Sequence, residues 1–491
     1  MTQSRSRQAD RRHVGERVSS ASVTGVHFVV VATIFAALVL LTGGASRSEV
    51  PHLAILYPTS VLTAAYVFIR GGAADLGTLK VPALLLVAYM TWVLIQLIPL
   101  PYPIWSALPE RQIIAELDGL VGLGEVWRPI TFVPDRTLAT LAGLFTPLAA
   151  LLVAGSVPAR DRHRLLRRIL LVAIGANAAL ALVHAVLGGD NLHLYVLSND
   201  ERPVGFFANV NHSVVFSAIG IVLWSMEFTA SAAMMRKTKD RATWNLLASS
   251  AALLCFIHIL IGGSRAGLIV ALPATLAALL LFLSGRADQR GSAENGDGSA
   301  IGKARGLIRK YRIALLVAVP TMMAGAFLLL GRIPALSRLY GESLADNVRW
   351  TLYDPLLDMI SSFWLLGAGF GAFEDVYYKF EPSALLAPFY VNQAHNDWLQ
   401  VIIEGGLPAA LLVIAGLVLI VRRILTVFRI PGNGAARAAA WLAVFGILSF
   451  ASLVDYPIRT PIFQITIVWL FVMLDRAASS ATILARETAN G

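Results

Sequence analysis

Long apolar runs alternate with short, mostly basic stretches along almost the whole chain. A transmembrane helix needs roughly 20 apolar residues, and on that measure the sequence predicts about twelve spans. We expect them near residues 26–42, 51–69, 81–99, 137–156, 168–188, 210–229, 244–262, 266–284, 313–331, 397–421, 438–455 and 461–479. The pattern therefore predicts an all-α polytopic membrane protein with a single transmembrane domain over residues 26–480.

The positions of Lys and Arg predict the orientation of these spans, because both residues accumulate in the cytoplasmic loops of membrane proteins. Every basic cluster falls on one side of the predicted spans, in residues 1–25, 70–80, 160–168, 236–241, 286–312 and 422–437. We therefore expect both termini in the cytoplasm, including the tail 481–491. The periplasmic side receives residues 100–136, with aromatic residues typical of an interfacial segment, and a large loop, 332–396, between the ninth and tenth predicted spans.

Composition supports a membrane protein and limits the other classes. The chain has 57% hydrophobic and 14% charged residues, whereas a soluble domain typically carries about 25% charged residues. Its net charge of +10 would suit nucleic acid, but the basic residues lie in clusters between apolar runs, so we expect no nucleic-acid partner. The single cysteine, Cys255, excludes an internal disulfide and a cysteine-based metal site, and we expect it to pack within a span.

His395 and Asn396 lie where a polar loop meets the tenth predicted span. Asn396 or Asp397 can act as the N-cap, and Gln400 follows Asp397 by three residues, as in a capping box. The positive end of such a helix suits an anionic group such as a diphosphate, and it also keeps a nearby imidazole neutral and able to accept a proton. The alternative is a capped helix whose histidine only lies at the interface.

Two arginines are further candidates on the same side. Arg265 lies in the tight turn 262–265 between two apolar runs, where a charge is costly unless it is paired or solvated in a cavity; the alternative is an arginine that extends to the membrane surface. Arg349 lies on a helix expected from Asp346 to Ser361. It can pair with Asp346 in the common surface manner, and taken alone that interpretation is the better one.

Other polar residues are weaker candidates. Arg202, Asn209 and Asn211 precede or open the sixth predicted span, where the asparagines can bind sugar hydroxyls or cap the helix. Asp455, Tyr456 and Arg459, in the last periplasmic turn, are compatible with an internal ion pair. Glu404 is expected on the opposite side of its helix from His395, so the two are not predicted to pair. The glycine-rich segment 367–371 is interpreted as part of a lid over an outward-opening cavity.

Taken in order, three groups of motifs resemble the O-antigen ligase and polymerase superfamily of bacterial envelope glycosyltransferases over roughly residues 200–420. They are Phe207-x-Asn209-x-Asn211, then Ser264-Arg265-x-Gly267, and then Asp346-x-x-Arg349 followed by the glycine-rich segment and His395-Asn396 with Gly406. The ligase pattern continues after Gly406 with two residues and then Gly, Thr or Tyr. Ala409 occupies that last position here, so the motif leaves open whether the chain is a ligase or a polymerase.

The resemblance implies a helical fold of the GT-C type and transfer of a glycan from undecaprenyl diphosphate to an acceptor on the periplasmic side, without a metal or cofactor. By position, Arg265 and Arg349 would hold the diphosphate, and His395 would activate the acceptor hydroxyl. Arg202, Asn209, Asn211 and Asn396 are the candidate substrate-binding residues. The independent chemistry agrees, because arginine binds phosphate oxygens with two parallel hydrogen bonds and an inverting attack needs one base and a stabilised leaving group.

The leading hypothesis is therefore an O-antigen ligase-like enzyme of the bacterial inner membrane with a lipid A-core acceptor. A repeat-unit polymerase, for O-antigen or exopolysaccharide, is the first alternative because it shares the donor. A transporter or flippase of lipid-linked glycan is the second, since about twelve spans is also a transporter count. The sequence shows no symmetry between its halves that would favour a transporter.

Overall fold

The computed structural model describes residues 27–47, 50–70, 77–188, 192–199, 202–234, 238–290, 351–383, 386 and 391–490. Within these ranges, eight helical stretches are long and apolar enough to cross a membrane. They are Pro134–Ser156 (α6, Pro134–Gly143, followed by α7, Phe145–Ser156), α8 (Ala159–Leu187), α9 (Val210–Met234), α10 (Thr238–Ile261), α11 (Arg265–Arg290), α17 (Asp397–Phe428), α18 (Gly434–Val454) and α19 (Pro461–Asn490).

Three shorter apolar helices join them, His27–Thr42, α2 (Leu53–Ile69) and α3 (Lys80–Gln96). Every predicted span except 313–331 therefore coincides with a helix, and that span lies outside the described residues. The all-α, multi-pass architecture is confirmed, whereas the count of twelve stays a prediction. The remaining described elements are too short to cross a membrane: η2 (Gly77–Leu79), β1 (Pro99–Leu100), α4 (Tyr102–Trp105), α5 (Gln112–Leu120), β2 (Arg128–Pro129), α15 (Tyr353–Phe363), α16 (Phe373–Phe380) and η5 (Pro457–Arg459).

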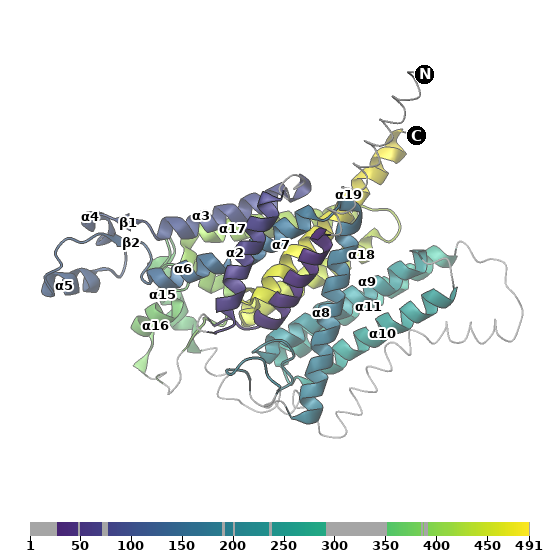
Figure 1. Ribbon diagram of the computed structural model, residues 1–491, viewed down its shortest axis with the longest axis horizontal. Coiled ribbons are helices and arrows are strands. Elements are labelled where there is room, and N and C mark those ends of the chain that lie inside the picture. The colour runs from purple at the N-terminus through teal and green to yellow at the C-terminus, as the bar shows by residue number, and fades with distance from the viewer. Residues whose placement is uncertain are drawn as a thin grey trace, which may run out of the picture.

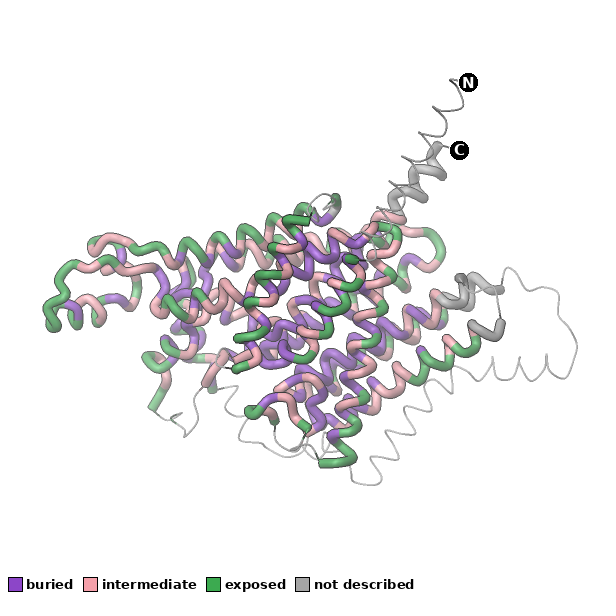
Figure 2. The backbone as a smooth tube through the Cα atoms, viewed as in Figure 1, coloured by how far each residue is buried: buried purple, intermediate pink, exposed green. Residues whose placement is uncertain are grey.

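Helix α9 packs against α8, α10, α11 and α18 and is the most buried of the membrane-length helices that the structure describes (Figures 1 and 2). Small residues allow the close approach: a Cβ at Gly220 would lie 2.3 Å from the Cγ2 atom of Ile174 on α8 and 3.0 Å from the sulfur of Cys255 on α10. Cys255 is fully buried, as its position predicted. At the end of the bundle that carries the basic loops, Arg167 pairs with Glu227 (3.0 Å) and Arg423 with Asp475 (2.9 Å), which neutralises buried carboxylates.

Residues 99–133 form an arm that ends in α5, at the left of Figure 1. Strands β1 and β2 pair antiparallel at its base, and Arg128 Nε donates to Asp118 Oδ2 (2.7 Å) further out. Trp105 is fully buried and donates to the Val126 carbonyl (2.8 Å). Trp105 and Trp127 are two of the aromatic residues that the sequence placed at the interface in 100–136; Trp105 forms the core of the arm, while Trp127 is exposed.

Helix α17 is broken at Gly406, which has φ +62° and ψ −161°. The carbonyls released by the break accept hydrogen bonds from elsewhere, since Ala368 N donates to Ile403 O (2.8 Å) and Gly369 N to Glu404 O (3.0 Å). Gln96 on α3 also donates to Glu404 O (2.9 Å). The glycine-rich segment 367–371, interpreted from the sequence as part of a lid, is hydrogen-bonded into the break, where it provides partners for carbonyls that the helix leaves free.

Replacing Gly367 by Ala is expected to lower the free energy of unfolding by roughly 2 kcal/mol or more. Gly367 has φ +78°, and an added Cβ would lie 2.2 Å from Glu404 O, a backbone atom that cannot move without opening the break in α17. Gly122→Ala is the matched control, because Gly122 has a similar φ of +73° but open space around it. Thermal unfolding in detergent should show the larger loss for Gly367→Ala, and equal losses would mean that the close approach does not matter.

Candidate active site

The loops predicted to face the periplasm meet at one end of the bundle. Ala208 N donates to Gly44 O (3.1 Å) and Ile462 N to Gly43 O (3.1 Å), which joins the loops after the first, fifth and penultimate helices. Phe132 N donates to Ala368 O (2.9 Å), which ties the arm to the segment before α17. Loops that alternate along the chain with the basic ones therefore share one end of the molecule, as the charge rule predicted.

Arg265 and His395 line the same cavity, of about 250 Å³, although 129 intervening residues separate them in the sequence. Tyr353 from α15 and Asn396 also border this cavity. The rest of its wall is largely apolar, formed by Ala266 and Ile269 on α11, Ala394, and Phe450, Leu453 and Val454 at the end of α18. The Arg265–His395 cavity thus has a cation and an imidazole beside a hydrophobic surface.

The turn between α10 and α11 fixes Arg265 at the first residue of α11. Gly263 has φ +65°, which makes the tight reversal possible, and Ser264 Oγ accepts a hydrogen bond from Gly267 N (3.0 Å) as the helix cap. Val214 on α9 packs against both flanking glycines, since a Cβ at Gly262 or Gly267 would lie 2.6 or 2.7 Å from it. The turn is therefore held rigidly against the central helix.

His395 has φ +51°, a left-handed conformation that residues other than glycine rarely adopt. Its neighbours hold it there: Ala394 N donates to Gln400 Oε1 (2.9 Å), and Asn396 Oδ1 accepts from Trp398 N (3.1 Å) and Leu399 N (3.2 Å). Asn396 is thus the N-cap, and Gln400 binds the segment before the helix rather than closing a capping box. Strain of this kind at a cavity wall is a feature of functional sites.

Asp455 is the group that His395 faces. The Nδ1 atom of His395 lies 3.6 Å from Asp455 Oδ1, and Nε2 of the buried His212 lies 3.7 Å from the same oxygen. Asn211 Nδ2 donates to Asp455 Oδ2 (2.7 Å). Burial alone would raise the pKa of Asp455, but the two imidazoles beside it hold this pKa well below its ordinary value, so the carboxylate is ionised at neutral pH.

The sequence had offered Asp455 only as part of an ion pair with Arg459, and this pairing is wrong. Arg459 Nη2 instead binds Glu404 Oε2 (3.0 Å), and its Nε lies 3.4 Å from Asp397 Oδ1. Glu404 is therefore engaged away from His395, as predicted. A signal was present in the sequence: charged residues at a membrane boundary must find partners, and the polar residues of 395–404 and 455–459 are complementary.

The candidate substrate-binding residues are placed differently from one another. Asn209 Oδ1 accepts from Asn211 N (2.8 Å), so it caps α9, and both asparagine side chains face Asp455, with Asn209 Nδ2 at 3.5 Å. Arg202 lies in the loop before α9, where its carbonyl is 3.1 Å from His193 Nε2, and it does not border the Arg265–His395 cavity. Arg349 lies outside the described residues.

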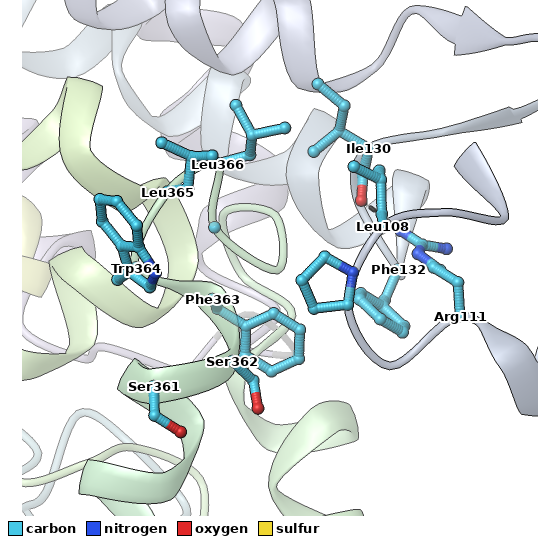
Figure 3. Close-up of a pocket in the computed structure, with 12 residues that line it drawn as sticks. Leu108, Arg111, Ile130, Phe132, Ser361, Ser362, Phe363, Trp364, Leu365 and Leu366 are labelled. Carbon is cyan, nitrogen blue, oxygen red and sulfur yellow. Dashed lines mark hydrogen bonds between the residues drawn. The ribbon is translucent and has the colours of Figure 1, made fainter. Parts of the chain in front are cut away.

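A separate cavity of about 230 Å³ lies between the arm and α15 (Figure 3). Phe132, Phe363 and Trp364 are among its mostly apolar lining residues, and Arg111 is its one charged residue. Arg111 is nearly buried, and its guanidinium lies 3.7 Å from the centroid of the Phe132 ring. This guanidinium also binds the carbonyls of Pro129 and Ile130. Of the candidate catalytic residues that the structure describes, neither Arg265 nor His395 lines this cavity.

Comparison with known proteins bears on the same part of the chain. Residues 250–414 match a family model described as O-antigen ligase, whereas no curated protein matches the chain. The matched segment contains Arg265, His395 and Asn396, together with the helix break at Gly406. The match covers about a third of the chain, and over this segment the chain is similar to the O-antigen ligase family.

Proposed function

We propose that the protein is a membrane glycosyltransferase, of the helical GT-C type, that moves a glycan from undecaprenyl diphosphate to an acceptor at the periplasmic face of the bacterial inner membrane. The observation that carries this proposal is the cavity shared by Arg265 and His395. One of these residues suits a diphosphate leaving group and the other suits an attacking hydroxyl, and each comes from a different, rigidly held element.

The walls of the Arg265–His395 cavity fit a lipid-linked diphosphate. A guanidinium binds phosphate oxygens with two parallel hydrogen bonds, and the apolar side chains of Ile269, Phe450 and Leu453 offer a surface for the first units of a polyprenyl chain. Arg349 is proposed as the second arginine, because it precedes Tyr353, a residue of the cavity wall, by only four positions. Two guanidiniums would balance the charge that develops on the leaving diphosphate.

His395 is proposed as the general base and Asp455 as the residue that orients it. The carboxylate lies on the Nδ1 side of the ring, which favours the tautomer with the proton on Nδ1 and leaves Nε2 to accept one. In the transfer step, Nε2 takes the hydroxyl proton of the acceptor while the oxygen attacks the anomeric carbon. The bond from that carbon to the diphosphate breaks, and undecaprenyl diphosphate leaves with the electron pair, so the anomeric configuration inverts.

A lipid A-core acceptor, and hence a ligase, is our preferred form of this proposal. The departure at Ala409 does not argue against it, because Ala409 is fully buried beside Val93 and Phe370, whereas Arg265 and His395 line the Arg265–His395 cavity. That position is therefore a packing position. A repeat-unit polymerase remains the alternative, because it would use the same donor and the same three side chains.

Purified protein supplied with undecaprenyl diphosphate-linked glycan and with lipid A-core tests the proposal. Glycan attached to lipid A-core identifies a ligase, and donor glycan lengthened by further repeats identifies a polymerase. If protein that remains folded forms neither of these products, the result contradicts an enzymatic function. Movement of the intact donor across the bilayer of proteoliposomes, without any transfer, would instead identify a flippase.

Asp455→Asn is expected to reduce transfer about 100-fold, with little loss of thermal stability. The amide keeps the shape of the carboxylate but removes the charge beside His395 Nδ1, and it brings a second amide group against Asn211. The matched control is Asp118→Asn, which removes a carboxylate from an ion pair in the arm. If the Asp455 variant transfers at the wild-type rate and with an unchanged pH profile, Asp455 does not position the histidine.

A further inference from the structure

A third cavity, of about 130 Å³, adjoins the segment that carries His395. Asn392 and Gln393 line this polar cavity, whereas the three residues that follow, Ala394 to Asn396, line the Arg265–His395 cavity. The two cavities are therefore separated by consecutive residues of one short stretch of chain. The other walls of the polar cavity come from α2, α6, α16, α17, η5 and α19.

The lining of the polar cavity has a different chemistry from that of its neighbour. Three arginines, two glutamates and several amides provide both donors and acceptors, among them Arg136, Gln393 and Gln400. The rings of Tyr57 and Phe373 are part of the same wall. Neighbouring donors and acceptors beside aromatic rings suit a ligand that presents many hydroxyls and a few C–H faces, which is the chemistry of a saccharide.

Gln400 connects the polar cavity to His395. This side chain is fully buried, and its Nε2 donates to Gln393 Oε1 (2.6 Å) and to Glu404 Oε1 (3.1 Å), while its Oε1 accepts from Ala394 N (2.9 Å). A ligand that binds Gln393 or Gln400 therefore contacts the groups that hold His395 in its left-handed conformation. The hydrogen bonds of the polar cavity thus reach Ala394, the residue that directly precedes the strained His395.

From this geometry we infer that the polar cavity is a saccharide-binding subsite, which takes a sugar of one transfer substrate at a distance from the bond that reacts. This inference rests on the proposed function. The sugar belongs either to the acceptor or to the glycan of the donor, and in both cases its binding draws the substrate toward the segment 391–396. The Arg265–His395 cavity remains the place of the diphosphate.

Two variants test the subsite. Arg136→Gln removes a guanidinium from the polar cavity, and Ala139→Phe fills part of the cavity without removing a polar contact. In steady-state assays with undecaprenyl diphosphate-linked glycan and lipid A-core, each varied while the other is saturating, we expect KM for one substrate to rise roughly tenfold. The value of kcat should stay within about twofold, because the groups at the reacting bond are untouched.

The substrate whose KM rises identifies the source of the sugar, acceptor or donor. Arg429→Gln is the control, an exposed arginine at the far end of α17. Arg136 also lies near Glu374 and Asp375 (3.6 and 3.8 Å), so the unfolding temperature of the Arg136→Gln variant is measured. If that variant is unstable, the result with Ala139→Phe alone decides. Unchanged KM values for both substrates in a folded Ala139→Phe variant would overturn the subsite alone, whereas absence of transfer by the wild type would overturn the proposed function.

Discussion

Replacing His395 by Ala is expected to reduce glycan transfer by roughly 10²- to 10⁴-fold, the range that a general base contributes. Among the described residues that line the Arg265–His395 cavity, His395 provides the one imidazole, a group suited to take the proton of an attacking hydroxyl. Its removal takes away no hydrogen bond that caps α17, because Asn396 provides that cap. The protein should therefore insert and fold normally, with an unfolding temperature in detergent close to that of the wild type.

The control for this substitution is His193→Ala. His193 lies in the loop before α9, at the same end of the bundle, but it borders neither the Arg265–His395 cavity nor the polar cavity. Transfer by the His193 variant should match the wild type. Normal surface-glycan assembly in a strain that carries only the His395 variant would remove His395 from the mechanism.

The second large effect is expected at Arg265. Arg265→Ala should lower transfer by roughly 10²- to 10³-fold, because loss of one group that stabilises a developing anion has this size in other enzymes. Arg265→Lys should recover part of this loss. Lysine keeps the positive charge, but it cannot form the paired hydrogen bonds of a guanidinium to phosphate oxygens.

The order of the three rates, Arg above Lys above Ala, is the informative result at this position. Arg160→Ala provides the control, since its side chain is 84% exposed at the start of α8, and it should transfer at the wild-type rate. If the lysine and alanine variants of Arg265 are both fully active, the guanidinium does not hold the diphosphate. If both are unfolded, the turn at Gly263 needs Arg265 for packing rather than for chemistry.

The transmembrane helices and the end at which they present polar residues could be predicted from the sequence, because both depend on local properties. Apolar run length determines where a helix can cross a membrane, and the distribution of Lys and Arg determines which loops share a side. These two rules were sufficient to place Arg265 and His395 at the same end. The structure adds that they line one cavity.

Contacts between distant side chains could not be predicted in the same way. Asp455 lies 60 residues beyond His395 and 243 beyond His212, and only the packing of α9, α17 and α18 brings the three together. The sequence shows that Asp455 must find a partner but not which one. The assignment to Arg459 was the nearest choice along the chain, and it was wrong because Arg459 faces the carboxylates at the start of α17.

The break in α17 could be predicted from the sequence only in part. Gly405-Gly406-Leu407-Pro408 is a strong local signal for an interruption, yet an apolar run with the right length for a span was interpreted as one continuous helix. An interrupted helix also needs partners for its released carbonyls, and these come from α3 and from residues 367–371. The glycine-rich segment therefore could not be understood without the break that it fills.

A cryo-EM structure of the protein with undecaprenyl diphosphate-linked glycan would test the central claim most directly. We expect density for the diphosphate inside the Arg265–His395 cavity, within hydrogen-bond distance of the Arg265 guanidinium, with the anomeric carbon on the side of His395. Diphosphate density at the opposite end of the bundle, or in a cavity that neither residue borders, would contradict the proposed active site.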